Sequence, residues 1–237
     1  MSLQKLLNDL DRQKDPERAV NLARFFQTGV GQYGEGDQFL GLTVPLLRQA
    51  VRLYWRDLSL ADVDHLVASK YHEHRLTGLF ILVKKYEKGM GDVKKSIFAF
   101  YLSHLDHVNN WDLVDLTAPN IVGDYLLTHP RAILYRYVRS FNLWHRRIAI
   151  LATASFIRRG EYKDTLAIAT ILLTDPHDLI HKAVGWMLRE VGKRDSPTLL
   201  TFLDAHATVM PRTMLRYAIE KLPPTAREHY LSHKTLH

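Results

Sequence analysis

The feature that most constrains the fold is a helical spacing of apolar residues that recurs from one end of the chain to the other. Leucine, isoleucine, valine and phenylalanine return every three or four positions, which places them on one face of a helix. The sequence lacks alternating apolar and polar runs bounded by turn residues, the pattern of half-buried strands. We therefore expect an all-α fold of about fourteen helices with short connections.

Capping residues place some of the helix starts. Asp15 followed by Pro16 predicts a helix that begins at the proline. Asn110 is a favourable N-cap and predicts a helix that begins at Trp111, while Pro119 ends or kinks that helix. The periodicity further predicts helices over 72–88, 120–127 and 143–159.

The expected helices form pairs that recur roughly every 30–45 residues, the spacing of HEAT-like repeats. Such pairs stack into a curved superhelix whose concave face is an extended binding surface. The sequence therefore predicts one HEAT-like domain over 1–237. The alternative is an ordinary all-α globule without a groove.

The chain is basic, with a net charge of +7. Residues 1–110 carry 15 Lys and Arg against 13 Asp and Glu, and residues 111–237 carry 17 against 12, so the excess lies mainly in the second half. An anionic partner or a simple solvated surface would both explain this charge. The sequence has no cysteine, no signal peptide at its start and no apolar run of membrane-spanning length, so we expect a cytoplasmic protein that contacts no membrane.

Trp111 and Asp115 are a candidate chemical pair, because residues four apart lie on one face of a helix. A carboxylate can stabilise a developing cation, and an indole face attracts positive charge. The alternative is a core tryptophan on a helix whose acids favour its positive N-terminal end. Asp112 points about 100° away from Trp111 on an ideal helix and is expected to be structural.

Two basic and aromatic segments in the second half are further candidates. Gly185 and Trp186 lie on an apolar helix, with Arg189 about one turn further on and Lys193 just past the helix end. A glycine inside a helix marks close packing or the close approach of a ligand, and the aromatic and cationic residues beside it suit a nucleotide surface. The alternative is a core tryptophan with solvated cations.

Arg146 and Arg147 begin another apolar helix, where backbone N–H groups favour phosphate. Arg212 lies at a similar basic helix start. Solvent-facing arginines are the alternative at both places.

Other chemistries find little support. The histidines of the His72-Glu73-His74 segment point to different sides of a helix, so we expect no metal site. The glycines of 27–41, the one long irregular segment, do not form a phosphate-binding loop, and no serine hydrolase motif is present. No metal or cofactor is therefore expected.

Several segments, in order and with compatible spacing, resemble the AlkD-type DNA alkylation repair glycosylases. They are Gly41-Leu42-Thr43-Val44-Pro45-Leu46-Leu47-Arg48, Glu73-His74-Arg75-Leu76, Trp111-Asp112-Leu113-Val114-Asp115, the Arg147 helix and Gly185-Trp186-Met187-Leu188-Arg189-Glu190. The resemblance runs across nearly the whole chain. Phe25 and Asn110 depart from it, since relatives have tyrosine and tryptophan there.

The resemblance implies a right-handed α-α superhelix of HEAT-like repeats that holds duplex DNA in a basic concave cleft. It also implies hydrolysis of the N-glycosidic bond of N3- and N7-alkylated purines in double-stranded DNA, the first step of base excision repair. The protein would work as a monomer, without an obligatory protein partner.

The resemblance also assigns roles to individual residues. Asp115 corresponds to the catalytic aspartate, and Trp111 and Trp186 correspond to the aromatic pair around the deoxyribose of the lesion. Arg147 corresponds to a DNA backbone contact. The other expected DNA-binding residues are Thr43, Arg48, Arg146, Arg189 and Lys193.

Two other functions stay open at this point. One is a HEAT-repeat protein that recognises DNA structure without catalysis, although such a protein could have lost Asp115 or either tryptophan. The other is a scaffold that binds proteins, which the basic charge disfavours. The sequence leaves open which alkylated bases are preferred and whether bulky adducts are accepted.

Overall fold

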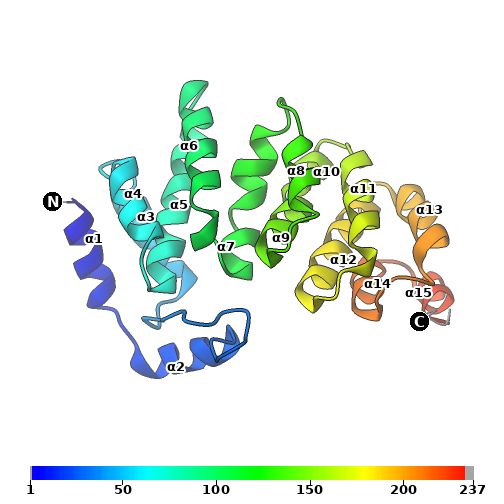
Figure 1. Cartoon of the computed structure of the whole chain (residues 1–237), viewed down its shortest axis with the longest axis horizontal. Coiled ribbons are helices and arrows are strands. Elements are labelled where there is room, and N and C mark those ends of the chain that lie inside the picture. Colours follow the sequence, from blue (N-terminus) through cyan, green and yellow to red (C-terminus); the bar gives the residue numbers. More distant parts are fainter. Residues whose placement is uncertain (1, 233–237) are drawn as a thin grey trace. The chain divides into compact units, whose positions relative to one another are not determined.

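Residues 2–232 are described by a computed structural model, and they form fifteen α-helices and three short 3₁₀ or π-helical segments (Figure 1). The all-α prediction is confirmed, because the only extended pairing in this range is an isolated bridge between Gln38 and Tyr71. The chain comprises two compact units, Met1–Thr117 and Ala118–His237. None of the helices in the described range is long and apolar enough to cross a membrane.

The first unit is built around one central helix, α5. Its elements are α1 (Ser2–Asp11), α2 (Pro16–Phe25), α3 (Val44–Tyr54), α4 (Leu60–Val67), α5 (His72–Lys88), α6 (Asp92–Ser103), the 3₁₀ turn η1 (Leu105–His107) and α7 (Trp111–Asp115). The predicted helix over 72–88 is confirmed as α5, which packs against α3, α4, α6 and α7. Gly78 allows α5 to approach α4, since a Cβ there would lie 2.8 Å from the Cβ of Leu66.

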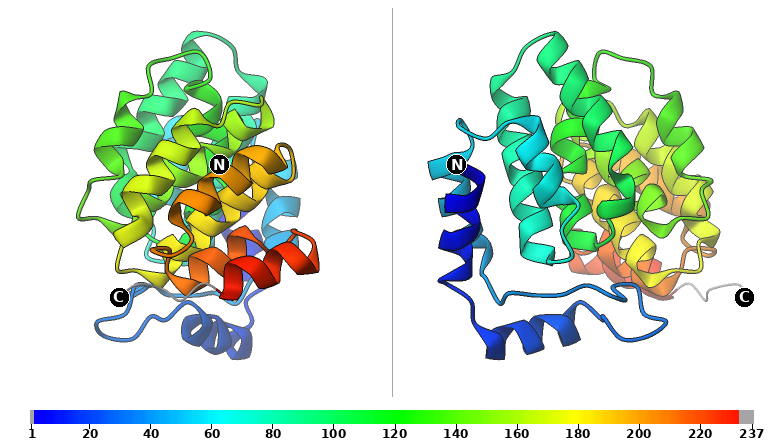
Figure 2. Two further views of the ribbon diagram at one scale, coloured as in Figure 1. Left: turned by 90° about the vertical axis from the view of Figure 1, so that its right-hand side faces the viewer. Right: turned by 60° about the vertical axis from the view of Figure 1, so that its left-hand side comes forward.

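Helix α2 stands apart from the main stack of this unit and lies crosswise to it, followed by the glycine-rich segment (Figure 2). The Asp15 side chain accepts a hydrogen bond from the Arg18 N–H, and Pro16 is the first helical residue, as the sequence predicts. None of the residues of α2 is fully buried. Phe26, directly after α2, is buried and joins α2 to the core.

The second unit is built around α12. Its elements are the π-helix η2 (Pro119–Gly123), α8 (Ala132–Tyr137), α9 (Leu143–Ala152), α10 (Ala154–Arg158), α11 (Lys163–Ile171), the 3₁₀ turn η3 (Leu172–Thr174), α12 (Asp178–Gly192), α13 (Ser196–His206), α14 (Arg212–Ala218) and α15 (Pro224–Ser232). Helix α12 packs against α9, α10, α11, α13 and α14. Most helices of each unit thus pack on one central helix, α5 or α12, and the all-α order of elements agrees with a helical-repeat fold.

Two helix predictions were wrong in this unit. The expected helix over 143–159 is divided at Thr153 into α9 and α10, and the expected helix over 120–127 begins as the π-helix η2. Both differences have one cause, because η2 packs on the junction of α9 and α10. Gly123 lies so close to the Ala152 carbonyl that a side chain would not fit, and the Ser155 hydroxyl donates to the Pro119 carbonyl at 2.6 Å.

Candidate functional site

Helix α7 presents Trp111 and Asp115 at the surface and buries the three residues between them. Trp111 and Asp115 are both half-exposed, whereas Asp112, Leu113 and Val114 are buried. The Asn110 side chain accepts a hydrogen bond from the Trp111 N–H at 2.8 Å, so the predicted N-cap is confirmed. One aromatic plane and one carboxylate therefore lie on the outer side of a short, capped helix.

Trp111 is held by a cluster of aromatic rings, which the sequence did not reveal. Its ring stacks on Phe26, with centroids 5.2 Å apart, and contacts the edge of Phe25 at 5.9 Å. Phe26 stacks in turn on Phe39 at 5.1 Å, and Phe39 stacks on the His72 imidazole at 4.8 Å. Packing between these rings fixes the plane of the indole.

Beneath this cluster lies a buried network of charged groups centred on His72. Nε2 of His72 lies 2.8 Å from Asp112 Oδ2, and Nδ1 lies 3.2 Å from Asp37 Oδ2. Arg75 donates to the other oxygen of Asp37 at 2.6 Å, and the Asn110 amide donates to Asp37 at 3.3 Å. The network thus connects α5, the glycine-rich segment and the first turn of α7. Asp112 has the structural role expected for it.

The network favours the protonated form of His72. Burial alone would lower the pKa of this imidazole, but hydrogen bonds to Asp112 and Asp37 outweigh that effect and raise the pKa from 6.5 to about 9. Burial pushes the pKa of Asp37 upward, but the hydrogen bond from His72 and the charge of Arg75 hold it below its ordinary value. Two carboxylates and two cations therefore balance each other inside the first unit.

We expect the stability of the protein to fall as the pH rises through about 9, because His72 then loses the proton that it shares with the two aspartates. Its folded pKa exceeds its unfolded value of 6.5, so the stabilisation is complete below that value and is lost above the folded pKa. The loss should be on the order of 3 kcal/mol. Urea unfolding between pH 6 and pH 10 measures it.

The matched control is His72→Gln, whose side chain cannot titrate. The difference in unfolding free energy between wild type and this variant should shrink across the same pH range, while the titration of tyrosines and lysines affects both proteins alike. A pH-independent difference would contradict the protonation of His72.

Glu73 fixes the segment that leads into α3. Its buried carboxylate accepts hydrogen bonds from the backbone N–H groups of Leu40, Gly41 and Leu42 at 2.9, 2.8 and 3.1 Å. Gly41 has a φ of +84°, and a side chain there would collide with the backbone carbonyl of Asp15. These hydrogen bonds hold the segment that leads to the expected DNA-binding residues Thr43 and Arg48 against α5.

The two expected DNA-binding residues of this segment, Thr43 and Arg48, have different surroundings. Thr43 precedes α3 as its N-cap residue without a side-chain cap, and it is half-exposed. Arg48 is exposed, and its guanidinium lies 4.5 Å from the centroid of the Phe80 ring. Stacking on an aromatic ring leaves the edge of a guanidinium able to donate.

In the second unit, Gly185 serves close helix packing. A Cβ at this position would lie 2.5 Å from both the Met214 carbonyl oxygen and the Tyr217 Cβ, so α12 approaches the backbone of α14 here. Trp186 is half-exposed on the next position of α12. The glycine thus marks close packing, one of the two interpretations drawn from the sequence.

Four expected DNA-binding cations of this unit already have protein partners. Arg189 pairs with Glu220, and Lys193 pairs with Glu190 at 2.6 Å. Arg146 pairs with Asp175, with Nε and Oδ2 2.6 Å apart. Arg147 is buried and donates to the Leu179 carbonyl. A DNA phosphate would have to compete with or add to these contacts, and their contact with DNA stays a prediction.

Sequence patterns pointed to His72 only as a possible metal ligand, and they gave no sign of Asp37. The reason is distance along the chain, because the partners of His72 lie 35 and 40 residues away. The nearest available signal was the run of four ionisable residues, 72–75, directly before the apolar part of a helix, because ionisable side chains beside such a run are seldom buried without partners.

These features define a class of protein. It is an all-α helical-repeat protein in which a short, N-capped helix presents a tryptophan and an aspartate at the surface. Comparison with known families identifies the class more closely. The chain belongs to the DNA alkylation repair enzyme family, whose family model matches residues 6–222. The resemblance found in the sequence is thereby confirmed at the level of the family.

A solved structure described as a predicted DNA alkylation repair enzyme from Enterococcus faecalis has a similar fold, with a TM-score of 0.72. The similarity covers 90% of this chain and 98% of that one, at 16% sequence identity. At this identity the likeness supports the fold alone. A comparison with curated proteins gave no match.

Proposed function

We propose that the protein is a DNA glycosylase that removes N3- and N7-alkylated purines from double-stranded DNA by hydrolysing the N-glycosidic bond. The observation that carries the proposal is the half-exposed pair Trp111 and Asp115 on a capped helix start, in a member of the DNA alkylation repair enzyme family. The basic excess of the chain suits a polyanionic substrate.

The chemistry requires little from the protein. Alkylation at N3 or N7 gives the purine a formal positive charge, so the base is already a good leaving group. As the bond to the base breaks, positive charge develops on the sugar, and the Asp115 carboxylate would stabilise it electrostatically. Asp115 would also accept a proton from the water that attacks the anomeric carbon. The base departs with the bonding electron pair and becomes neutral.

The aromatic residues would act on the same cation. The indole of Trp111 is fixed by its stack on Phe26, so it can present an aromatic surface to the sugar without losing side-chain freedom on binding. Trp186 would supply a second aromatic surface. Thr43, Arg48, Arg146, Arg147, Arg189 and Lys193 are proposed contacts to the DNA backbone, which position the duplex without selecting a sequence.

We expect the wild-type protein to release free N7-methylguanine and N3-methyladenine from methylated duplex DNA and to leave unmodified duplex intact. Chromatography of the released bases measures this, and alkali cleavage of the remaining strand reports the abasic site. Salt-dependent DNA binding without release of any base would instead identify a protein that only recognises DNA structure. Absence of DNA binding would favour a protein-binding scaffold.

A further inference from the structure

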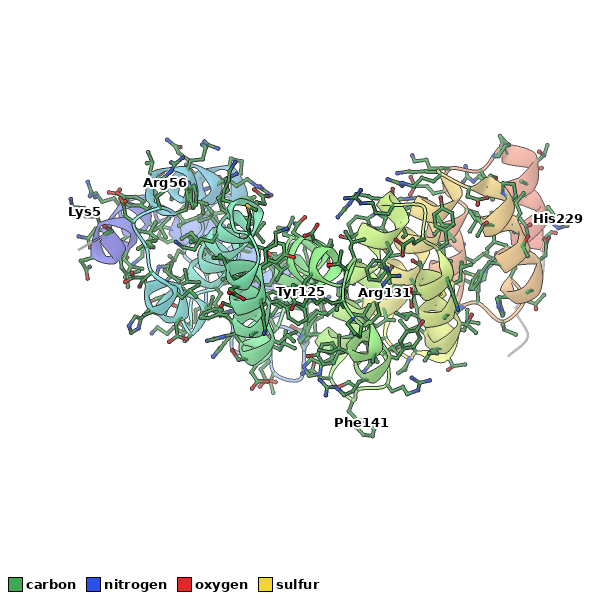
Figure 3. The ribbon with its side chains drawn as sticks, turned by 90° about the horizontal axis from the view of Figure 1, so that it is seen from above. Lys5, Arg56, Tyr125, Arg131, Phe141 and His229 are labelled. Atoms are coloured by element: carbon green, nitrogen blue, oxygen red, sulfur yellow. The ribbon has the colours of Figure 1, made fainter. Side chains whose placement is uncertain are left out.

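Phe141 is the most exposed large apolar side chain in the described part of the chain, with a relative exposure of 104%. It lies between α8 and α9 and projects away from the rest of its unit (Figure 3). A phenylalanine side chain that stays in water forgoes the favourable free energy of burial, so this exposed ring could gain that free energy by binding a partner.

The turn that carries Phe141 is firmly held on both sides. Arg146 Nη1 donates to the carbonyls of Ser140 and Phe141 at 2.9 and 3.0 Å, and its Nε is anchored on Asp175. The Ser140 hydroxyl accepts from the Asn142 N–H at 3.1 Å. The backbone of Phe141 is therefore fixed while its ring stays in water.

A second set of contacts ties the turn to α9. The Asn142 side chain caps this helix by accepting from the Trp144 N–H at 2.8 Å. The Ser140 hydroxyl also lies 3.1 Å from His145 Nδ1. The turn is thus a rigid platform for one aromatic ring, because little backbone freedom is left to lose on binding.

Two arginines precede Phe141 in the chain, and one of them, Arg136, lies over the Tyr137 ring at 5.6 Å. Arg136 and Arg139 are both exposed and lie on the α8 side of the turn. The Arg139 guanidinium donates to the Tyr135 carbonyl at 2.8 Å, and neither arginine forms a salt bridge with a carboxylate within residues 2–232. A single exposed ring that follows two exposed arginines in the chain differs from the contiguous apolar patch of a protein-docking surface.

We propose that Phe141 is a wedge that inserts into the base stack of duplex DNA, while Arg136 and Arg139 contact the phosphates beside it. DNA combines an apolar stack with an anionic backbone, and DNA-bending proteins insert apolar side chains between base steps in this way. The inference rests on the proposed function, since it takes DNA as the partner. The experiment below can nevertheless refute the wedge without refuting the proposed glycosylase function, and the reverse.

The experiment measures affinity for a duplex that contains one N7-methylguanine, as a function of salt, by fluorescence anisotropy. Phe141→Ala should weaken binding roughly tenfold, the effect of losing one base–aromatic contact, with an unchanged slope of log affinity against log salt. Arg139→Gln should reduce that slope by about one phosphate contact. Met90→Ala is the matched control, because Met90 is 83% exposed in a turn of the first unit.

Unstacking itself can be observed with 2-aminopurine placed at successive positions of the same duplex. Wild type and Phe141→Leu, which keeps an apolar wedge, should raise the fluorescence at one step, whereas Phe141→Ala should not. Thermal unfolding checks that all variants are folded. Equal DNA affinity of Phe141→Ala and wild type, or a loss equal to that of Met90→Ala, would overturn the proposal.

Base release in the same duplex separates the two hypotheses. If the wild-type protein unstacks the duplex but releases no base, the proposed glycosylase function is refuted and the proposed wedge is supported. If the wild-type protein releases the base without any unstacking, the proposed wedge is refuted and the proposed glycosylase function is supported. Weaker binding of Phe141→Ala to a protein or to anionic lipid vesicles, with DNA binding unchanged, would identify a different partner and overturn the wedge.

Discussion

Replacing Asp115 by asparagine should reduce base release by a factor of about 10²–10⁴ while DNA binding stays close to that of the wild type. The substitution keeps the size of the side chain but removes the negative charge that would stabilise the sugar cation and the base that would activate water. Single-turnover release of N7-methylguanine from a defined duplex measures the rate of the chemical step. Undiminished release would refute the proposed role of Asp115.

Asp112→Asn is the matched control for this experiment, because it makes the same chemical change three residues earlier on α7. Asp112 accepts from His72 inside the first unit rather than at the surface. We expect its substitution to lower stability and to leave the chemical step of the folded protein largely intact. Equal loss of base release in both variants would show that α7 as a whole, and not the Asp115 carboxylate, controls the reaction.

Replacing Asp37 by alanine should destabilise the protein by about 3–5 kcal/mol, the effect of leaving buried cations without their partner. Asp37 is buried and bridges His72 and Arg75, and the amide of Asn110 also donates to it. Urea unfolding at pH 7 measures the difference. Asp37→Asn should lower the free energy of unfolding by less, because the amide oxygen of asparagine can still accept a hydrogen bond from Arg75.

Asp11→Asn is a control for the general effect of removing an acidic side chain. Asp11 pairs with Lys14 at the surface, and such pairs contribute little to stability. We expect a change below about 1 kcal/mol. A similarly small change for Asp37→Ala would mean that the buried network is dispensable for folding.

Local signals carried the sequence predictions that the structure confirms. Asp15 and Asn110 were identified as caps because a capping side chain binds N–H groups within its own turn. The helix over 72–88 was placed correctly because it contains a long apolar run and because Gly89 follows its last residue. Family membership followed from several short segments in the right order.

The features that escaped prediction depend on contacts between distant residues. The division of α9 from α10 arises from the approach of Gly123 to the Ala152 carbonyl, which no property of 143–159 reveals. The His72 network joins residues that are far apart in the sequence, so the histidine looked like one of thirteen scattered ones. Phe141 was overlooked because exposure is a property of the folded chain.

Glu73 divides the glycine-rich segment into two parts that should differ in their tolerance of insertions. Its carboxylate receives three consecutive N–H groups, from Leu40 to Leu42, so adding or removing a residue there would shift every donor out of register. In the preceding turns, the N–H groups of Gly31 and Gly34 bond instead to Glu35 and Gln27, so a longer chain could loop outward there without disturbing Glu73. Relatives of this protein should therefore vary in length before Asp37 and keep a constant spacing from Asp37 to Thr43.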